Sequence, residues 1–242
     1  MVFIAMCFVV FLYQNNLLDV PAQLFAIQYG AIPSVIFGHA SLPEDAAVAF
    51  PAVFTLVTSM FLHGGWMHLL GNMLYLWIFG NNIEDAMGHA KFIVFYILSG
   101  ILAALSHALT DPSSEIPMVG ASGAISAVLG AYLLLYPRAR VLVMLPAIGM
   151  TRVPAGIVLG MWFVTQLVSG GMSVGSKGGG VAFFAHIGGF LVGAVYAFIQ
   201  VPRDLNVDPR RTNSVIHTLG IVAIAIYIAE AVFAIFRITE SA

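Results

Sequence analysis

"MVGASGAISAVLGAYLLLYP", residues 118–137, is an apolar run long enough to cross a lipid bilayer, which takes roughly 20 residues of helix. Ser122 stands near its start, and its neighbours Gly120, Ala121 and Gly123 have almost no side chain. A serine that faces lipid can bond back to a carbonyl of its own helix and needs no space cleared around it. The cleared space therefore indicates that another group approaches Ser122 closely.

The whole chain has the composition of a membrane protein. Of its 242 residues, 60% are hydrophobic and 8% are charged, and the mean hydropathy is +0.98. Soluble domains carry about 25% charged residues. We therefore predict an all-α polytopic membrane protein. The predicted spans are seven apolar segments, at about 1–14, 66–83, 91–109, 119–136, 153–170, 181–200 and 214–236.

The basic residues predict how these spans are oriented, because cytoplasmic turns carry an excess of Lys and Arg. With the N-terminus in the cytoplasm, only Lys177 and Arg237 of the nine Lys and Arg residues fall on the outer side. The others fall on cytoplasmic turns: Lys91, Arg138, Arg140, Arg152, Arg203, Arg210 and Arg211.

Several classes of function are disfavoured. The net charge of −2, without a basic tract, predicts no nucleic-acid partner. Cys7 is the single cysteine, so neither an intrachain disulfide nor a cysteine-based metal site is available. His63 and His68 lack a third ligand nearby, and no phosphate or dinucleotide fingerprint occurs, so neither a metal nor a cofactor is predicted. A transporter would carry ionisable residues near the midplane of several spans, whereas the polar residues here cluster in the outer third.

Three polar groups in the predicted spans point to chemistry, because polar residues inside a membrane are costly. One is Ser122. Another is the pair His68 and Asn72, four residues apart and thus on one helix face. The third is His186, early in the span 181–200 and at a depth similar to Ser122. The alternative for each group is purely structural: helix cross-links, small-residue packing, or a histidine bonded to a helix carbonyl.

Glycines on two helix faces predict that the groups of Ser122 and His186 meet. Gly189 and Gly193 share a helix face with His186, and the face of Ser122 continues through Ser126 and Gly130 in "GASGAISAVLG", residues 120–130. Such small faces let helices approach closely. We therefore expect the spans 119–136 and 181–200 to touch at the depth of the serine and the histidine.

Together the groups predict acyl-transfer chemistry. Serine needs an adjacent base to remove its proton, and His186 can supply that base and then protonate the leaving amine. The Ser122 backbone N–H and Asn72, assisted by His68, can bind the oxyanion. Because no carboxylate is expected at matching depth in these spans, the sequence predicts a Ser–His dyad. Since hydrolysis needs water, the dyad should open to the outside through a polar cavity.

Three motifs in this order and spacing resemble the rhomboid intramembrane serine proteases: "HGGWMHLLGNMLYLWIFGNNIED" (63–85), "GASGAISAVLG" (120–130) and "AHIGGFLVGA" (185–194). The resemblance implies a six-helix core over residues 1–201, with a long first outer loop at 19–62. Residues 202–242 would add a basic cytoplasmic linker and a seventh transmembrane helix. The site residues it implies are Ser122 as nucleophile, His186 as base, His68 and Asn72 in the oxyanion hole, and structural roles for His63, Gly120, Gly123, Gly189, Gly193 and Glu84.

The resemblance also implies what the protein acts on. Its substrates would be single-span membrane proteins, cleaved near the extracytoplasmic face where helix-weakening residues let the helix unwind. The connection at 170–180, with Gly171, Gly175 and Gly178–Gly180, would act with the span 153–170 as a gate. A compact chain without a targeting segment fits a prokaryotic cytoplasmic membrane. The alternative is a catalytically inactive rhomboid-like protein that binds membrane clients.

Three features depart from the family pattern. Phe54-Thr55 stands where similar enzymes often carry Trp-Arg in the first loop. Ser126 stands where an aromatic residue often follows the nucleophile and packs on the catalytic histidine. The seventh span, 214–236, goes beyond the family's six-helix minimum, and its Glu230 has no expected role beyond a polar helix contact.

Overall fold

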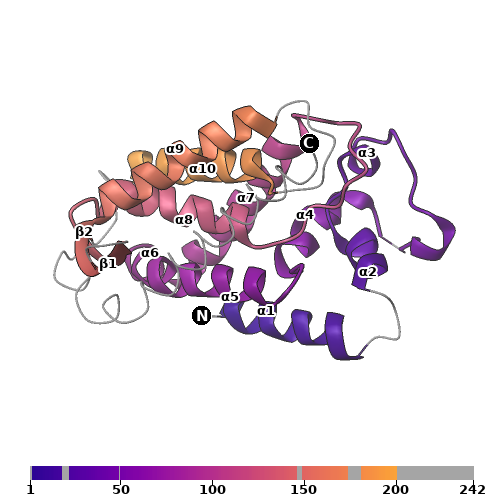
Figure 1. Ribbon diagram of the computed structural model, residues 1–242. Coiled ribbons are helices and arrows are strands. Elements are labelled where there is room, and N and C mark those ends of the chain that lie inside the picture. Colours follow the sequence, from indigo (N-terminus) through magenta and orange to yellow (C-terminus); the bar gives the residue numbers. More distant parts are fainter. Residues whose placement is uncertain (1, 18–21, 49, 146–148, 174–180, 201–242) are drawn as a thin grey trace.

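The computed structural model describes residues 2–17, 22–48, 50–145, 149–173 and 181–200, which form a bundle of apolar helices (Figure 1). Three of the described helices are long and apolar enough to cross a membrane by themselves: α7 (His89–Ala108), α9 (Ala155–Ser173) and α10 (Phe183–Gln200). A fourth span is possible if the bent pair Ala52–Phe61 and Trp66–Met87 counts as one. The described residues therefore support an integral membrane protein.

The first predicted span is α1 (Val2–Leu12), which continues as one π-helical turn, η1, at Tyr13–Leu17. The region predicted as a long loop is built from short helical pieces instead of irregular chain. These are α2 (Ala22–Tyr29), α3 (Pro33–Ile36), η2 (Glu44–Ala46), η3 (Ala52–Phe54), α4 (Thr55–Thr58) and η4 (Ser59–Phe61). An isolated bridge between Ala31 and Met118 ties this region to the segment before Ser122.

The predicted span at 66–83 is a composite helix. It consists of α5 (Trp66–Tyr75), the π-helical turn η5 (Leu76–Gly80) and α6 (Asn81–Met87), so it extends four residues past the predicted end. Gly88, with φ of +81°, ends α6, and α7 starts at His89. Glycine adopts this backbone conformation without steric cost, which makes it suitable for a tight turn between two antiparallel helices.

The predicted span at 119–136 is shorter than expected. The helix there, α8 (Ser122–Leu135), has 14 residues, because Gly120 has φ of +124° and the chain before Ser122 is not helical. Most residues of α8 are buried, including every residue from Ala124 to Tyr132, so it forms the centre of the bundle. A helix that starts inside the protein needs fewer residues than one that spans the whole bilayer, and its first N–H groups lie in the interior.

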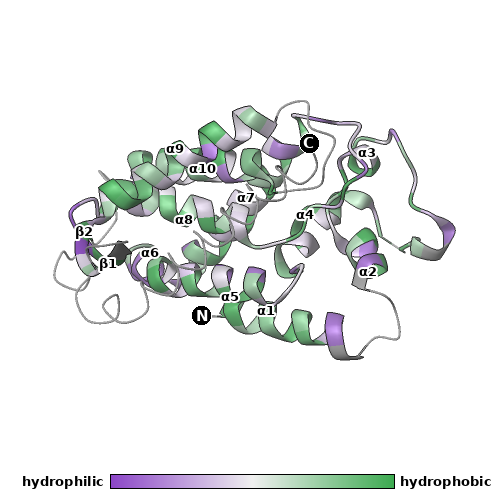
Figure 2. Cartoon of the chain, viewed as in Figure 1, coloured by the Kyte–Doolittle hydropathy of each residue, from purple (hydrophilic) through white to green (hydrophobic). Residues whose placement is uncertain are grey.

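The connection between α8 and α9 contains the two strands among the described residues, which the all-α prediction did not include. Strands β1 (Arg140–Leu145) and β2 (Gly149–Pro154) form an antiparallel hairpin in which Val141 faces Val153 and Val143 faces Thr151. Val141 and Val143 are buried against the helical core, so one face of the hairpin packs on the bundle. Figure 2 shows hydrophilic residues on β2, at one end of the bundle.

Six of the seven predicted spans coincide with described helices or composite helices. The seventh, 214–236, lies outside the described residues, as do Glu230, the linker from residue 202, and the basic residues Lys177, Arg203, Arg210, Arg211 and Arg237. The count of six core helices plus one therefore stays a prediction. The boundary of the predicted connection at 170–180 was also wrong: Gly171 lies inside α9, while Gly175 and Gly178–Gly180 fall outside the described residues.

Candidate functional site

The site is built on close contact between α8 and α10. A Cβ atom added to Gly193 would collide with the carbonyl oxygen of Ala127, and one added to Gly189 would collide with the carbonyl oxygen of Gly123. Gly130 meets the backbone of α10 in the same way. The two helices therefore touch backbone to backbone, as small-residue faces in membrane proteins allow. Any larger side chain at these positions would push α8 and α10 apart.

This contact brings Ser122 and His186 together. Ser122 is the first residue of α8, His186 is in the first turn of α10, and Nε2 of His186 lies 2.8 Å from Oγ of Ser122. The histidine is 6% exposed, so its ring is almost fully inside the protein. The distance is that of a hydrogen bond between the serine hydroxyl and the ring, an arrangement in which a base can activate a nucleophile.

The other ring nitrogen of His186 has a partner that the sequence analysis missed. Gln166, on α9 and 2% exposed, places its side-chain oxygen 2.8 Å from Nδ1 of His186. Trp162, one turn earlier on α9, has its ring centroid 6.0 Å from that of His186, with the planes tilted by 36°. The signal was available, because Gln166 is an amide inside an apolar span. An amide oxygen can accept a hydrogen bond from a histidine as a carboxylate does, so the absence of a carboxylate does not leave the ring without a partner.

His68 and Asn72 lie beside the same helix start, on α5. A Cβ atom on Gly120 would lie 2.7 Å from Nε2 of His68 and 3.8 Å from Nδ2 of Asn72, so the missing side chain leaves a space next to both groups. The N–H of Gly64 donates to Nδ1 of His68 (3.4 Å), which leaves Nε2 as the proton-bearing nitrogen.

The buried Nδ2 of Asn72 has no hydrogen-bond partner among the described residues. Leaving a buried donor unpaired costs about 1–3 kcal/mol. An unpaired donor close to Ser122 is an arrangement suited to a charge that develops only during a reaction.

His63 lies in the turn before α5 and is fully buried. Its ring packs against that of His68 with centroids 5.2 Å apart, and its Nδ1 lies 3.3 Å from the carbonyl oxygen of Phe61. Gln14, in η1, donates to the carbonyl oxygen of His63 (3.1 Å). These contacts connect the end of the first helix to the start of α5 and hold the residues around His68 in place.

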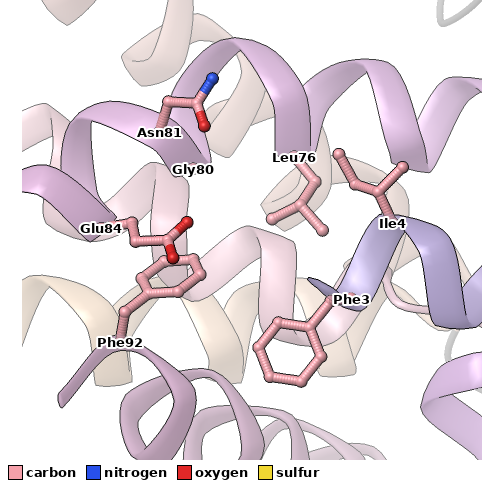
Figure 3. A pocket seen from close by; sticks show the side chains of 7 residues that line it. All are labelled: Phe3, Ile4, Leu76, Gly80, Asn81, Glu84 and Phe92. Atoms are coloured by element: carbon pink, nitrogen blue, oxygen red, sulfur yellow. The ribbon is translucent and has the colours of Figure 1, made fainter. Parts of the chain in front are cut away.

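Glu84 lies at the other end of the composite helix, away from Ser122. Its Oε1 is 2.7 Å from Nδ1 of His89, the first residue of α7. It also lines a small pocket between α1, the composite helix and α7 (Figure 3), with Phe3, Ile4, Leu76, Gly80, Asn81 and Phe92. The structure therefore places Glu84 at a helix junction and outside the group formed by Ser122 and His186.

The departures from the family pattern have local explanations. The hydroxyl of Ser126 donates to the carbonyl oxygen of Ser122 in its own helix (2.7 Å), and the tryptophan beside His186 comes from α9 instead. Thr55 donates to the carbonyl oxygen of Ala52 (2.6 Å), which closes a local turn, and the Phe54 side chain next to it is 55% exposed.

Comparison with known proteins agrees with this architecture. The sequence model of the Rhomboid domain matches residues 51–203. The chain is 36% identical over 90 residues to Rhomboid protease GluP of Bacillus subtilis, covering 37% of this chain and 17% of the relative. It is 28% identical over 148 residues to Rhomboid protein 1, mitochondrial, of Saccharomyces cerevisiae, covering 60% and 41%.

A third match, 29% identical over 200 residues, is the Presenilin-associated rhomboid-like protein, mitochondrial, of Bos taurus, covering 75% of this chain and 49% of the relative. In each of these three matches the chain spans less than half of the relative's own length. The matched domain covers more than half of this chain and contains both the α8–α10 contact and the residues around Ser122. The chain therefore belongs to the rhomboid family.

Proposed function

We propose that the protein is an intramembrane serine endopeptidase in which Ser122 is the nucleophile and His186 the general base. The observation that carries the proposal is the 2.8 Å between Ser122 Oγ and His186 Nε2 inside an apolar bundle. Ser126, one turn further along α8, illustrates the ordinary alternative, because its hydroxyl bonds to a carbonyl of its own helix. Ser122 bonds instead to a base on another helix.

In the proposed reaction His186 accepts the proton of Ser122 Oγ as the oxygen attacks the scissile carbonyl carbon. The negative charge that develops on the substrate oxygen is bound by the Asn72 amide, by Nε2–H of His68 and by the backbone N–H of Ser122 at the start of α8. His186 then donates its proton to the leaving amine. A water molecule, activated by the same ring, releases the acyl group and restores the serine.

The substrates we propose are single-span membrane proteins cleaved near the extracytoplasmic face. A transmembrane helix hides its peptide bonds in hydrogen bonds, so a substrate has to contain glycine, proline or other residues that let it unwind. We infer a core over residues 1–201 with six transmembrane helices and the N-terminus in the cytoplasm. Residues 202–242 would add the linker and the seventh helix, and the proposed location is a prokaryotic cytoplasmic membrane.

The decisive experiment measures covalent labelling of the purified protein by a fluorophosphonate, which reacts with activated serines. We expect the wild type to be labelled and both Ser122→Ala and His186→Ala to lose the label. Ser126→Ala is the matched control: it removes a serine from the same helix and should keep the label.

Absence of label on the folded wild type, beside an active rhomboid protease in the same detergent, would contradict the proposal. The protein would then be interpreted as a catalytically inactive member that binds membrane clients. Label retained by Ser122→Ala would place the reactive residue elsewhere.

A further inference from the structure

Gln166 is a buried polar residue on a helix whose surface is otherwise largely apolar and exposed. Its side chain is 2% exposed, whereas Val164 and Val168 of the same helix are 55% and 57% exposed. Burying an amide is unfavourable unless its polar atoms are hydrogen-bonded. The contact of Gln166 Oε1 with His186 Nδ1 (2.8 Å) satisfies its oxygen.

The neighbouring threonine determines which end of the amide faces the histidine. The Thr165 hydroxyl donates its single hydrogen to the carbonyl oxygen of Trp162 (2.6 Å). It can therefore only accept a hydrogen bond from Gln166, whose Nε2 lies 3.3 Å away. With its nitrogen directed to Thr165, Gln166 presents its oxygen to His186.

The same reasoning extends to the histidine. Since Gln166 Oε1 accepts, Nδ1 of His186 has to carry the ring proton, and Nε2 of the neutral ring is left as an acceptor facing Ser122 Oγ. All the hydrogen bonds then run in one direction, from Ser122 through His186, Gln166 and Thr165 to the carbonyl of Trp162. Such aligned chains polarise one another and strengthen each bond.

We propose that Gln166 is the positioning residue for His186: its amide oxygen selects the ring tautomer that can remove the proton of Ser122. The inference rests on the proposed function, because tautomer selection affects a rate only if His186 is a base. In the opposite tautomer Nε2 would carry the proton and could not accept another from the serine. A neutral amide achieves the selection without placing a charge inside the membrane, which a carboxylate would require.

The first test compares the full-length wild type with Gln166→Met and Gln166→Glu in the fluorophosphonate reaction, measured as a rate against probe concentration. Methionine keeps the length and volume but removes the amide acceptor. We expect its maximal labelling rate to fall about 10–100-fold, the range found for orienting partners of metal-bound histidines, with the probe concentration for half-maximal rate unchanged. Glutamate restores an oxygen acceptor and should recover most of the rate. Val168→Ala, on the exposed side of α9, should match the wild type.

The second test can be decided on the wild type, because it reads the ring tautomer directly. With ¹⁵N-labelled histidine, NMR distinguishes a protonated Nδ1 from a protonated Nε2, and His186→Ala assigns the signal. We expect Nδ1–H in the wild type at neutral pH, and a population of Nε2–H in folded Gln166→Met. A wild-type ring with Nε2–H overturns the inference whatever the variants do.

The outcomes separate the two proposals. If the wild type is not labelled, the proposed function fails and the inference fails with it. If the wild type is labelled and folded Gln166→Met reacts at the same rate, the inference alone is overturned and the Ser122–His186 proposal stands. A loss in Gln166→Met that Gln166→Glu reverses supports both.

Discussion

The two helix contacts that surround His186 differ in kind. Between α8 and α10 the backbones touch, and the glycines at 189 and 193 leave no room for another atom. Between α9 and α10 the contact is made by side chains, chiefly Trp162 and Phe163 packing on His186 and Phe190. Ser122 and His186 therefore lie on the close-packed α8–α10 interface. Gln166, which we propose orients His186, lies on α9, whose contact with α10 is made by side chains.

This difference separates two requirements of a catalytic site. The distance between two reacting side chains has to be constant, and backbone contact keeps it so because neither helix can move without losing many contacts at once. The orientation of the ring can depend on a helix that moves. Any displacement of α9 would therefore move Gln166 and Trp162 relative to the ring, while the α8–α10 contact keeps Ser122 and His186 together.

The largest effect is expected from filling the α8–α10 contact. Gly193→Ala adds a methyl group where the carbonyl oxygen of Ala127 already lies, so the helices have to separate. Overpacking of this kind costs typically 1–3 kcal/mol, and we expect about 3 kcal/mol here because the opposing atom is backbone and cannot rotate away. Thermal unfolding in detergent measures the change, and fluorophosphonate labelling should fall with it. Unchanged stability would show that the two helices are not in backbone contact.

A smaller effect is expected from weakening the α9–α10 contact. Trp162→Ala removes a ring that packs on both His186 and Phe190, with centroid distances of 6.0 Å and 5.9 Å. Aromatic pairs contribute about 0.5–1.5 kcal/mol beyond burial. If this energy holds His186 in its reactive orientation, its loss lowers the labelling rate by up to roughly tenfold while the protein stays folded. Trp162→Phe retains a ring and should recover most of the rate. If Trp162 only filled space, Trp162→Ala would unfold at a lower temperature, but the labelling rate of the folded variant would equal that of the wild type.

The smallest effect, and one of opposite sign, is expected on the exposed face of α9. No described heavy atom lies within 4 Å of a Cβ atom added to Gly160, so Gly160→Ala has no steric cost. Alanine favours a helix over glycine by about 0.5–1 kcal/mol, and the variant should be more stable by that amount. The same glycine-to-alanine substitution is therefore expected to lower the stability on α10 and to raise it on α9. If Gly160→Ala destabilised the protein as much as Gly193→Ala, the contrast between the two contacts would be wrong.

Much of the architecture could be predicted because hydrophobicity and charge are local properties of a sequence. Apolar length located the long described helices but not the short ones between residues 22 and 61, and the glycine faces of 120–130 and 185–194 predicted which two long helices would touch. The β-hairpin at 140–154 was missed because its alternating pattern extends over too few residues to stand out beside charged turns. The predicted span began at residue 119, three residues before the start of α8 at Ser122, since an apolar run continues across a helix start without any change in composition.

The sequence by itself determined that this is a helical membrane protein of the rhomboid family, and it placed a serine and a histidine at similar depth on two small-residue faces. Those conclusions follow from properties that neighbouring residues share: hydropathy, side-chain volume and helical period. Only the tertiary structure decided what surrounds the histidine. Gln166 and Trp162 are no closer to His186 in sequence than many other polar or aromatic residues, and their contact depends on how α9 is rotated and how near it lies to α10. The direction of the hydrogen bonds from Ser122 to Trp162 depends on the rotation of α9 and on its distance from α10, because a donor and an acceptor become partners only when folding sets their distance and angle.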